Sequence, residues 1–109
     1  MSFDMNKLMQ QAAQMQEQVQ RMQEDAVKEV AESSVGGGMV KVTANGAGQV
    51  LTIVISPDAI DPADLEGLAD LVLAGVNEAL RSATAAVEAK AQAMQSELLG
   101  GLGLPGLEP

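Results

Sequence analysis

Cysteine, histidine, tryptophan and tyrosine are all absent from this 109-residue chain, and Phe3 is its single aromatic residue. Without cysteine there is no disulfide framework and no thiolate metal site, and without histidine the usual zinc ligand and general base are missing. The sequence also shows no nucleophile placed beside a base. We therefore predict that the protein is not an enzyme and that it uses no metal or cofactor.

Basic residues are scarce as well. Six of them stand against fifteen acidic residues, which gives a formal charge of −9. Binding to the DNA backbone needs clustered Lys and Arg, and single strands are usually bound by stacking on aromatic side chains. Composition alone therefore argues against a nucleic-acid partner.

Long apolar runs are also missing. The N-terminus, MSFDMNKLMQQ, is polar, and the stretch LEGLADLVLAGV is interrupted by Asp70. A helix that spans a bilayer needs about 20 apolar residues, and a secretory leader needs an apolar segment of its own. We expect a soluble, cytoplasmic protein without membrane contacts. It should form a single domain over residues 1–99, followed by a disordered Gly- and Pro-rich tail at 100–109.

The segment that is most informative runs from Val35 to Ser56, VGGGMVKVTANGAGQVLTIVIS. Apolar side chains alternate along both of its halves, at Val40, Val42, Ala44, Leu51, Ile53 and Ile55. This is the period of two strands buried on one face. Asn45-Gly46 and Gly48 tolerate positive φ, so the chain can reverse there. A loop of two or four residues would set Val40 and Val42 opposite the odd-numbered residues Leu51 and Ile53.

Before this hairpin, apolar residues recur with spacings that alternate between three and four, at Met5, Leu8, Ala12, Met15, Val19, Met22 and Ala26. This heptad seam predicts a helix, capped by Ser2 or Asp4, that packs against a helical partner. We expect a first strand near Lys28–Ser34 and a flexible turn at Gly36–Gly38.

The basic residues of this first helix, Lys7, Arg21 and Lys28, share one heptad position on its outer face. They can be read as a basic ridge. They can also be read as an ordinary solvated face, because Glu17 and Glu24 stand four residues before Arg21 and Lys28, in the favourable order for intrahelical ion pairs.

Beyond the hairpin, Asp61 and Pro62 predict the N-cap and first position of a second helix. No further proline follows up to Leu98. Such a helix is about 55 Å long, whereas a compact domain of this size is roughly 34 Å across. The predicted fold is therefore α+β: an N-terminal helix, an antiparallel sheet of about three strands, and a long C-terminal helix that projects as an arm. Because the seam and the arm have little intramolecular surface to cover them, we expect a homodimer.

The order of these elements resembles the YbaB/EbfC family of bacterial nucleoid-associated proteins. The segments LMQQAAQMQEQVQRMQED, GGGMVKVTANGAG and LADLVLAGVNEAL carry the resemblance, which extends from about Asn6 to Leu98. It implies an intertwined, tweezer-like homodimer that binds double-stranded DNA in the nucleoid. Given the charge of the chain, this binding should be weak and largely independent of sequence.

The resemblance also implies that polar and basic side chains of the first and last helices contact DNA. The matching positions here are Lys7, Arg21, Arg81 and Lys90. Arg81 and Lys90 are nine residues apart, about 180° around a helix, so they cannot serve one flat surface. A second interpretation stays open, a dimeric structural or adaptor module that binds a protein partner through its projecting helices.

Overall fold

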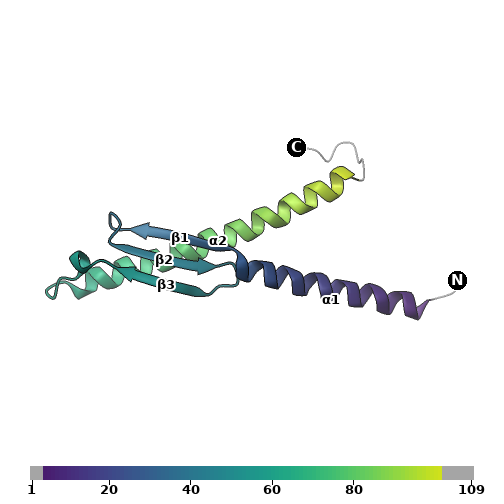
Figure 1. Ribbon diagram of the computed structural model, residues 1–109, viewed down its shortest axis with the longest axis horizontal. Coiled ribbons are helices and arrows are strands. Elements are labelled where there is room, and N and C mark those ends of the chain that lie inside the picture. The colour runs from purple at the N-terminus through teal and green to yellow at the C-terminus, as the bar shows by residue number, and fades with distance from the viewer. Residues whose placement is uncertain (1–3, 102–109) are drawn as a thin grey trace.

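The computed structural model describes residues 4–101. Its elements, in chain order, are α1 (Met5–Lys28), β1 (Val30–Val35), β2 (Val40–Asn45), β3 (Val50–Ile55), the 3-10 helix η1 (Pro57–Ala59) and α2 (Leu65–Gly101). The strands form one antiparallel sheet in the order β1-β2-β3, and α2 crosses one of its faces (Figure 1). The predicted α+β fold is confirmed. Neither helix of this described part is both long and apolar enough to cross a bilayer.

The helix α1 begins at a side-chain cap and ends where the chain becomes extended. The Asp4 carboxylate accepts hydrogen bonds from the backbone N–H groups of Asn6 (3.1 Å) and Lys7 (3.2 Å). At the other end Glu29 is extended, and its N–H donates to the Ala26 carbonyl (3.2 Å). The first strand therefore exists as predicted, but it runs from Val30 to Val35 rather than from Lys28 to Ser34.

The hairpin forms as predicted and pairs even-numbered with odd-numbered residues around Val40 and Val42. These two residues, however, lie opposite Ile55 and Ile53 rather than opposite Leu51 and Ile53. Leu51 has no such partner, because a bulge after Thr43 sets Ala44 opposite Val50. The face that carries Val40 and Val42 is the face that α2 covers, since both side chains are completely buried.

The core is small and lies between α2 and the first two strands. Its fully buried apolar side chains are those of Val40, Val42, Ala44, Ala79 and Ala83. The buried Ser33 hydroxyl donates to the Gly75 carbonyl of α2 (2.6 Å), and a Cβ at Gly75 would lie only 3.0 Å from Val42. In β3, by contrast, all six residues are exposed. The third strand is thus an uncovered edge of the sheet.

The start of α2 differs from the prediction. The Asp61 side chain and carbonyl accept from Ala63 (2.9 Å) and Asp64 (2.9 Å), which makes a separate turn. The N–H of Gly67 then donates to the Asp64 carboxylate (3.0 Å), and the helix begins at Leu65. The predicted cap at Asp61 and Pro62 is therefore wrong by one turn, because a second Asp, Asp64, accepts from one of the first N–H groups of the helix.

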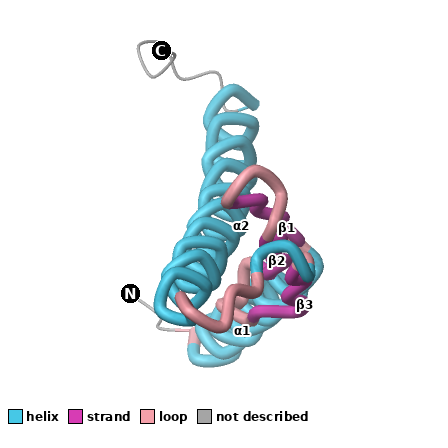
Figure 2. The backbone as a smooth tube through the Cα atoms, turned by 90° about the vertical axis from the view of Figure 1, so that its left-hand side faces the viewer, coloured by secondary structure: helices cyan, strands magenta, loops and turns pink. Residues whose placement is uncertain are grey.

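The described chain is elongated, with extents of 76 × 33 × 17 Å and a radius of gyration of 21.1 Å, against about 13 Å for a compact domain of 100 residues. Figures 1 and 2 show why: α1 and the second half of α2 leave the same end of the sheet and diverge. We call these two helical segments the arms and the space between them the V. The projection of α2 is confirmed, and α1 projects as well.

The predicted tail at 100–109 falls mostly outside the described residues. Its first two residues, Gly100 and Gly101, complete α2. The division into a domain at 1–99 and a disordered tail stays a prediction.

Candidate nucleic-acid interface

Gly46 holds the two arms together at the base of the V. Its N–H donates to the carbonyl oxygens of Ala26 and Glu29, both at 2.9 Å. A Cβ at this position would collide with the side chain of Val87 on α2 and lie 3.0 Å from the Ala26 oxygen. Glycine is thus required here for close approach. It is not required for the positive φ that the sequence suggested, which occurs at Gly48 instead.

Lys90 also lies at the base of the V. Its ammonium forms an ion pair with Glu29 (2.5 Å), whose side chain is only 21% exposed. The hydrogen bond to Glu29 and the negative charge of that carboxylate raise the pKa of Lys90, and Asp25 adds a smaller contribution of the same sign. Lys90 therefore links α2 to the junction of α1 and β1, and its charge is already partnered.

This ion pair gives a testable pH dependence. The pKa of Lys90 is raised above the ordinary value of 10.5, so the pair should stabilise the fold fully below that pH and lose its effect as pH rises through the raised pKa. Lys90→Met should melt at a lower temperature than the parent at neutral pH, and this gap should close in strongly alkaline buffer. Lys41→Met removes a lysine outside this pair and should leave the pH profile of the parent intact. A difference in melting temperature that stays the same at every pH would show that the ion pair does not contribute to stability.

The basic residues of α1 lie off the side of the helix that carries Ala26, by about 100° at Lys7, about 140° at Arg21 and about 160° at Lys28. We call Lys7, Arg21 and Lys28 the outer ridge. All three are exposed, as is nearly all of α1, which contains no buried residue. Arg21 contacts Glu17 at 3.5 Å, but both side chains are about 70% exposed (70% and 68%). Such a surface pair contributes little, so the guanidinium is available to a phosphate.

Arg81 lies on another surface. Its neighbours Ala79 and Ala83 are both fully buried against the sheet, and residues two positions away point about 160° from Arg81 on a helix. Arg81 therefore faces away from the sheet, and Lys90 lies at the base of the V. The structure brings Lys7 and Arg21 onto one side of α1, about 21 Å apart along the axis, and separates them from the other two predicted residues.

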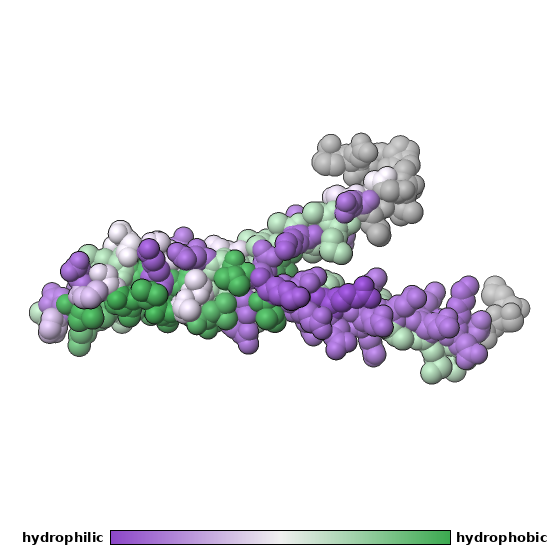
Figure 3. Space-filling model, viewed as in Figure 1, coloured by the Kyte–Doolittle hydropathy of each residue, from purple (hydrophilic) through white to green (hydrophobic). Residues whose placement is uncertain are grey.

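Two further cations were not among the predicted site residues. Lys28 continues the outer ridge toward the sheet, and the heptad spacing already pointed to it. Lys41 lies between the buried Val40 and Val42, so it is on the open face of the sheet. The alternation of the strand could have placed Lys41 on this face from the sequence alone. Figure 3 shows that hydrophilic residues cover α1 in this view, whereas hydrophobic residues concentrate over the sheet.

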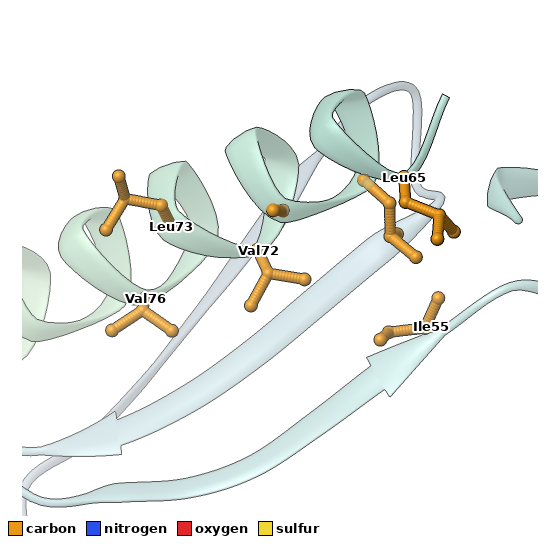
Figure 4. Close-up of a pocket in the computed structure, with 7 residues that line it drawn as sticks. Ile55, Leu65, Val72, Leu73 and Val76 are labelled. Carbon is orange, nitrogen blue, oxygen red and sulfur yellow. The ribbon is translucent and has the colours of Figure 1, made fainter. Parts of the chain in front are cut away.

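An apolar groove lies between β3 and the first half of α2. It is lined by Ile55, Leu65, Leu68, Ala69, Val72, Leu73 and Val76. In Figure 4, Ile55 points from β3 toward Leu65 and Val72 of the helix. No lining residue is polar, so the groove has no ligand for a metal or a charged cofactor. Within residues 4–101 there is also no cluster of three or more acidic side chains arranged to hold a metal ion.

Comparison with known families decides the identity of this fold. The model of the YbaB/EbfC DNA-binding family matches residues 1–98. The chain belongs to this family. YbaB/EbfC proteins form a DNA-binding family rather than an enzyme family, in agreement with the interpretation of the sequence.

Individual YbaB/EbfC relatives match over nearly their full length. The nucleoid-associated protein Teth39_2199 of Thermoanaerobacter pseudethanolicus is 44% identical over 105 residues, which cover 96% of this chain and 91% of the relative. A nucleoid-associated protein of Moorella thermoacetica is 46% identical over 103 residues, covering 94% and 95%. The crystal structure of the uncharacterized protein HP0035 from Helicobacter pylori matches with a TM-score of 0.65 at 22% identity, over 90% of this chain and 99% of that one. This last likeness concerns the fold alone.

Proposed function

We propose that this protein is a nucleoid-associated protein of the bacterial cytoplasm that binds duplex DNA weakly and largely without sequence specificity, as a tweezer-like homodimer. The observation that carries the proposal is the family match over residues 1–98. The relatives named as nucleoid-associated proteins support it. Of the four predicted residues, Lys7 and Arg21 are the first candidates for phosphate contacts, Arg81 is a separate candidate, and Lys90 acts chiefly as the link to Glu29.

The charge of the chain limits the affinity. A dimer carries −18 (2 × −9) with twelve basic residues (2 × 6). Phosphates can be neutralised only by the exposed basic residues, such as those of α1, where the neighbouring acids Glu17, Glu24 and Asp25 weaken the effect. Neutral donors such as glutamine side chains must supply the remaining contacts. None of the exposed cations is arranged to read base edges in a groove, so the binding should depend little on sequence.

The uncovered apolar surface supports the homodimer. The side of β3 that carries the exposed residues Ile53 and Ile55, together with the groove beside it, forms an apolar area without a charged lining residue. An exposed, hydrophobic edge strand ordinarily pairs with another chain or is covered. Two chains of charge −9 can meet through such a surface without burying any charge. We propose that this surface lies at the dimer interface and that the closed, two-fold form is the functional unit.

Titration of fluorescent duplexes of unrelated sequence at low and moderate salt tests the DNA-binding proposal. We expect a slope of log K against log salt of roughly −2 to −5, at ~0.9 per neutralised phosphate, and similar affinities for all sequences. If the parent protein binds no duplex even at low salt, the adaptor interpretation replaces this one, and the next experiment is a search for a protein partner.

The double variant Arg21→Ala/Arg81→Ala tests the candidate contacts. Both side chains are exposed, so dimer mass and melting temperature should stay the same. Affinity should fall about equally for every duplex, and the salt slope should become shallower by about one for each phosphate that is no longer neutralised. The matched control is Ser34→Glu/Thr52→Glu, which makes the same change in net charge on the sheet. Equally weakened binding in both variants would mean that only net charge matters.

A further inference from the structure

The walls of the V are the sides of α1 and α2 that face each other. Both are apolar, near the base of the V and farther along the arms. Gly46 lies between Ala26 of α1 and Val87 of α2, which shows the side that each helix turns toward the other. The helical repeat continues the same side outward along each arm. On α1 this side carries Met22, Val19, Met15 and Leu8, and on α2 it carries Ala91 and Met94.

The large side chains of these walls are exposed within the described chain. Met15 is 70% exposed, Met94 66% and Leu8 52%. A heptad seam is stable when it packs against another helix, and methionine adapts its shape to such a neighbour. In this protomer Gly46 and the ion pair between Lys90 and Glu29 join the arms only at the base, and the large apolar side chains farther out are left exposed.

The charges of α1 all lie off its apolar seam, with Lys7 and Asp25 nearest to it, about 100° around the helix. They are Lys7, Glu17, Arg21, Glu24, Asp25 and Lys28. At 100° per residue they fall within an arc of about 100°, centred about 150° from the apolar seam. The one cation at the base of the V is Lys90, which is paired with Glu29 and lies close to Asp25. A DNA backbone placed in the V would therefore meet apolar walls and no free cation among the described side chains.

We infer that an arm of a second copy of this chain fills the V, so that the surface left to DNA is the outer ridge with Lys28 as its member closest to the sheet. This inference rests on the proposed function. The heptad seam of α1 is itself an uncharged helical surface, so the seam of the second copy can pack against such a wall. The wall is also continuous with the groove, because Leu73, Leu80, Val87 and Met94 follow one another at intervals of seven along α2. One apolar strip thus runs from the proposed dimer surface into the V.

Single cysteines test this inference, because the natural chain contains none. Met15→Cys places a thiol on the wall, and Gln14→Cys places one on the outer ridge, one residue away. Both positions are exposed in the protomer, so neither change should disturb the fold. The rate of maleimide labelling is measured for each dimer with and without a short duplex of mixed sequence. Val19→Cys and Gln18→Cys repeat the comparison should one variant fold poorly.

Without DNA, Met15→Cys should react on the order of tenfold more slowly than Gln14→Cys, as an occluded position does, and this protection should disappear on dilution to monomer. Added duplex should slow only Gln14→Cys. Equal rates without DNA would overturn the inference, and so would protection of Met15→Cys that appears only with DNA, or in a chain that light scattering shows to be monomeric. Failure of the proposed function would appear separately, as no effect of duplex on Gln14→Cys and no binding in the titration.

Discussion

Val42→Asp should leave the chain largely unfolded at 25 °C. Val42 is completely buried at the centre of β2, beneath α2. A carboxylate there would have no cationic partner, and removing an ion from water costs several kcal/mol even after relaxation. Natural domains have only about 5–15 kcal/mol of stability, and this core contains few fully buried side chains. Loss of the helical circular-dichroism signal and of the thermal transition measures the effect.

The matched control is Ser34→Asp. Ser34 pairs with Lys41 on the open face of the sheet and is exposed, so the new carboxylate stays in water beside a lysine. Its melting temperature should lie within a few degrees of the parent, since exposed substitutions change stability by about 0.5 kcal/mol or less. Equal destabilisation by the two substitutions would contradict the assignment of the sheet faces.

The local pattern of the sequence was sufficient to predict the hairpin and its faces. Strict alternation in β2 predicted that Val40 and Val42 share the buried face. An even turn length predicted odd-numbered partners for them, but these are Ile55 and Ile53 rather than Leu51 and Ile53, so the exact register was not predicted. The seam of α1 and the length of α2 followed in the same way from the helical repeat. These features depend on residues that are close together in the sequence, so the periodicity of apolar residues predicts them.

Features that depend on distant residues could not be predicted in this way. The need for glycine at position 46 comes from Val87, and the partner of Lys90 is Glu29, far away in the sequence. The candidate site was the part of the molecule that the sequence predicted least well. Sequence could assign Lys7 and Arg21 to one side of a helix, but only the packed structure shows that Lys90 is already paired and that Arg81 faces elsewhere.

Ile53 shows a related limit of alternation. The pattern places it on the buried face, and it does pair with the buried Val42. In the protomer, however, its side chain is 44% exposed, because α2 covers the first two strands and leaves β3 open. The substitution Ile53→Asp should therefore act mainly on the proposed dimer, not on the core of the single chain.

The dimer should dissociate when Ile53 is replaced by aspartate. Two-fold symmetry places the substitution in the interface twice, so two carboxylates are removed from water and two isoleucine side chains no longer pack there. A combined destabilisation of about 4 kcal/mol raises the Kd of the dimer about a thousandfold. Light scattering after size exclusion should then give the 11.2 kDa of one chain in place of 22.4 kDa (2 × 11.2 kDa). Thr52→Asp, on the opposite face of the same strand, should keep the dimer mass. A dimer that survives Ile53→Asp at micromolar concentration would exclude the inner face of β3 from the interface.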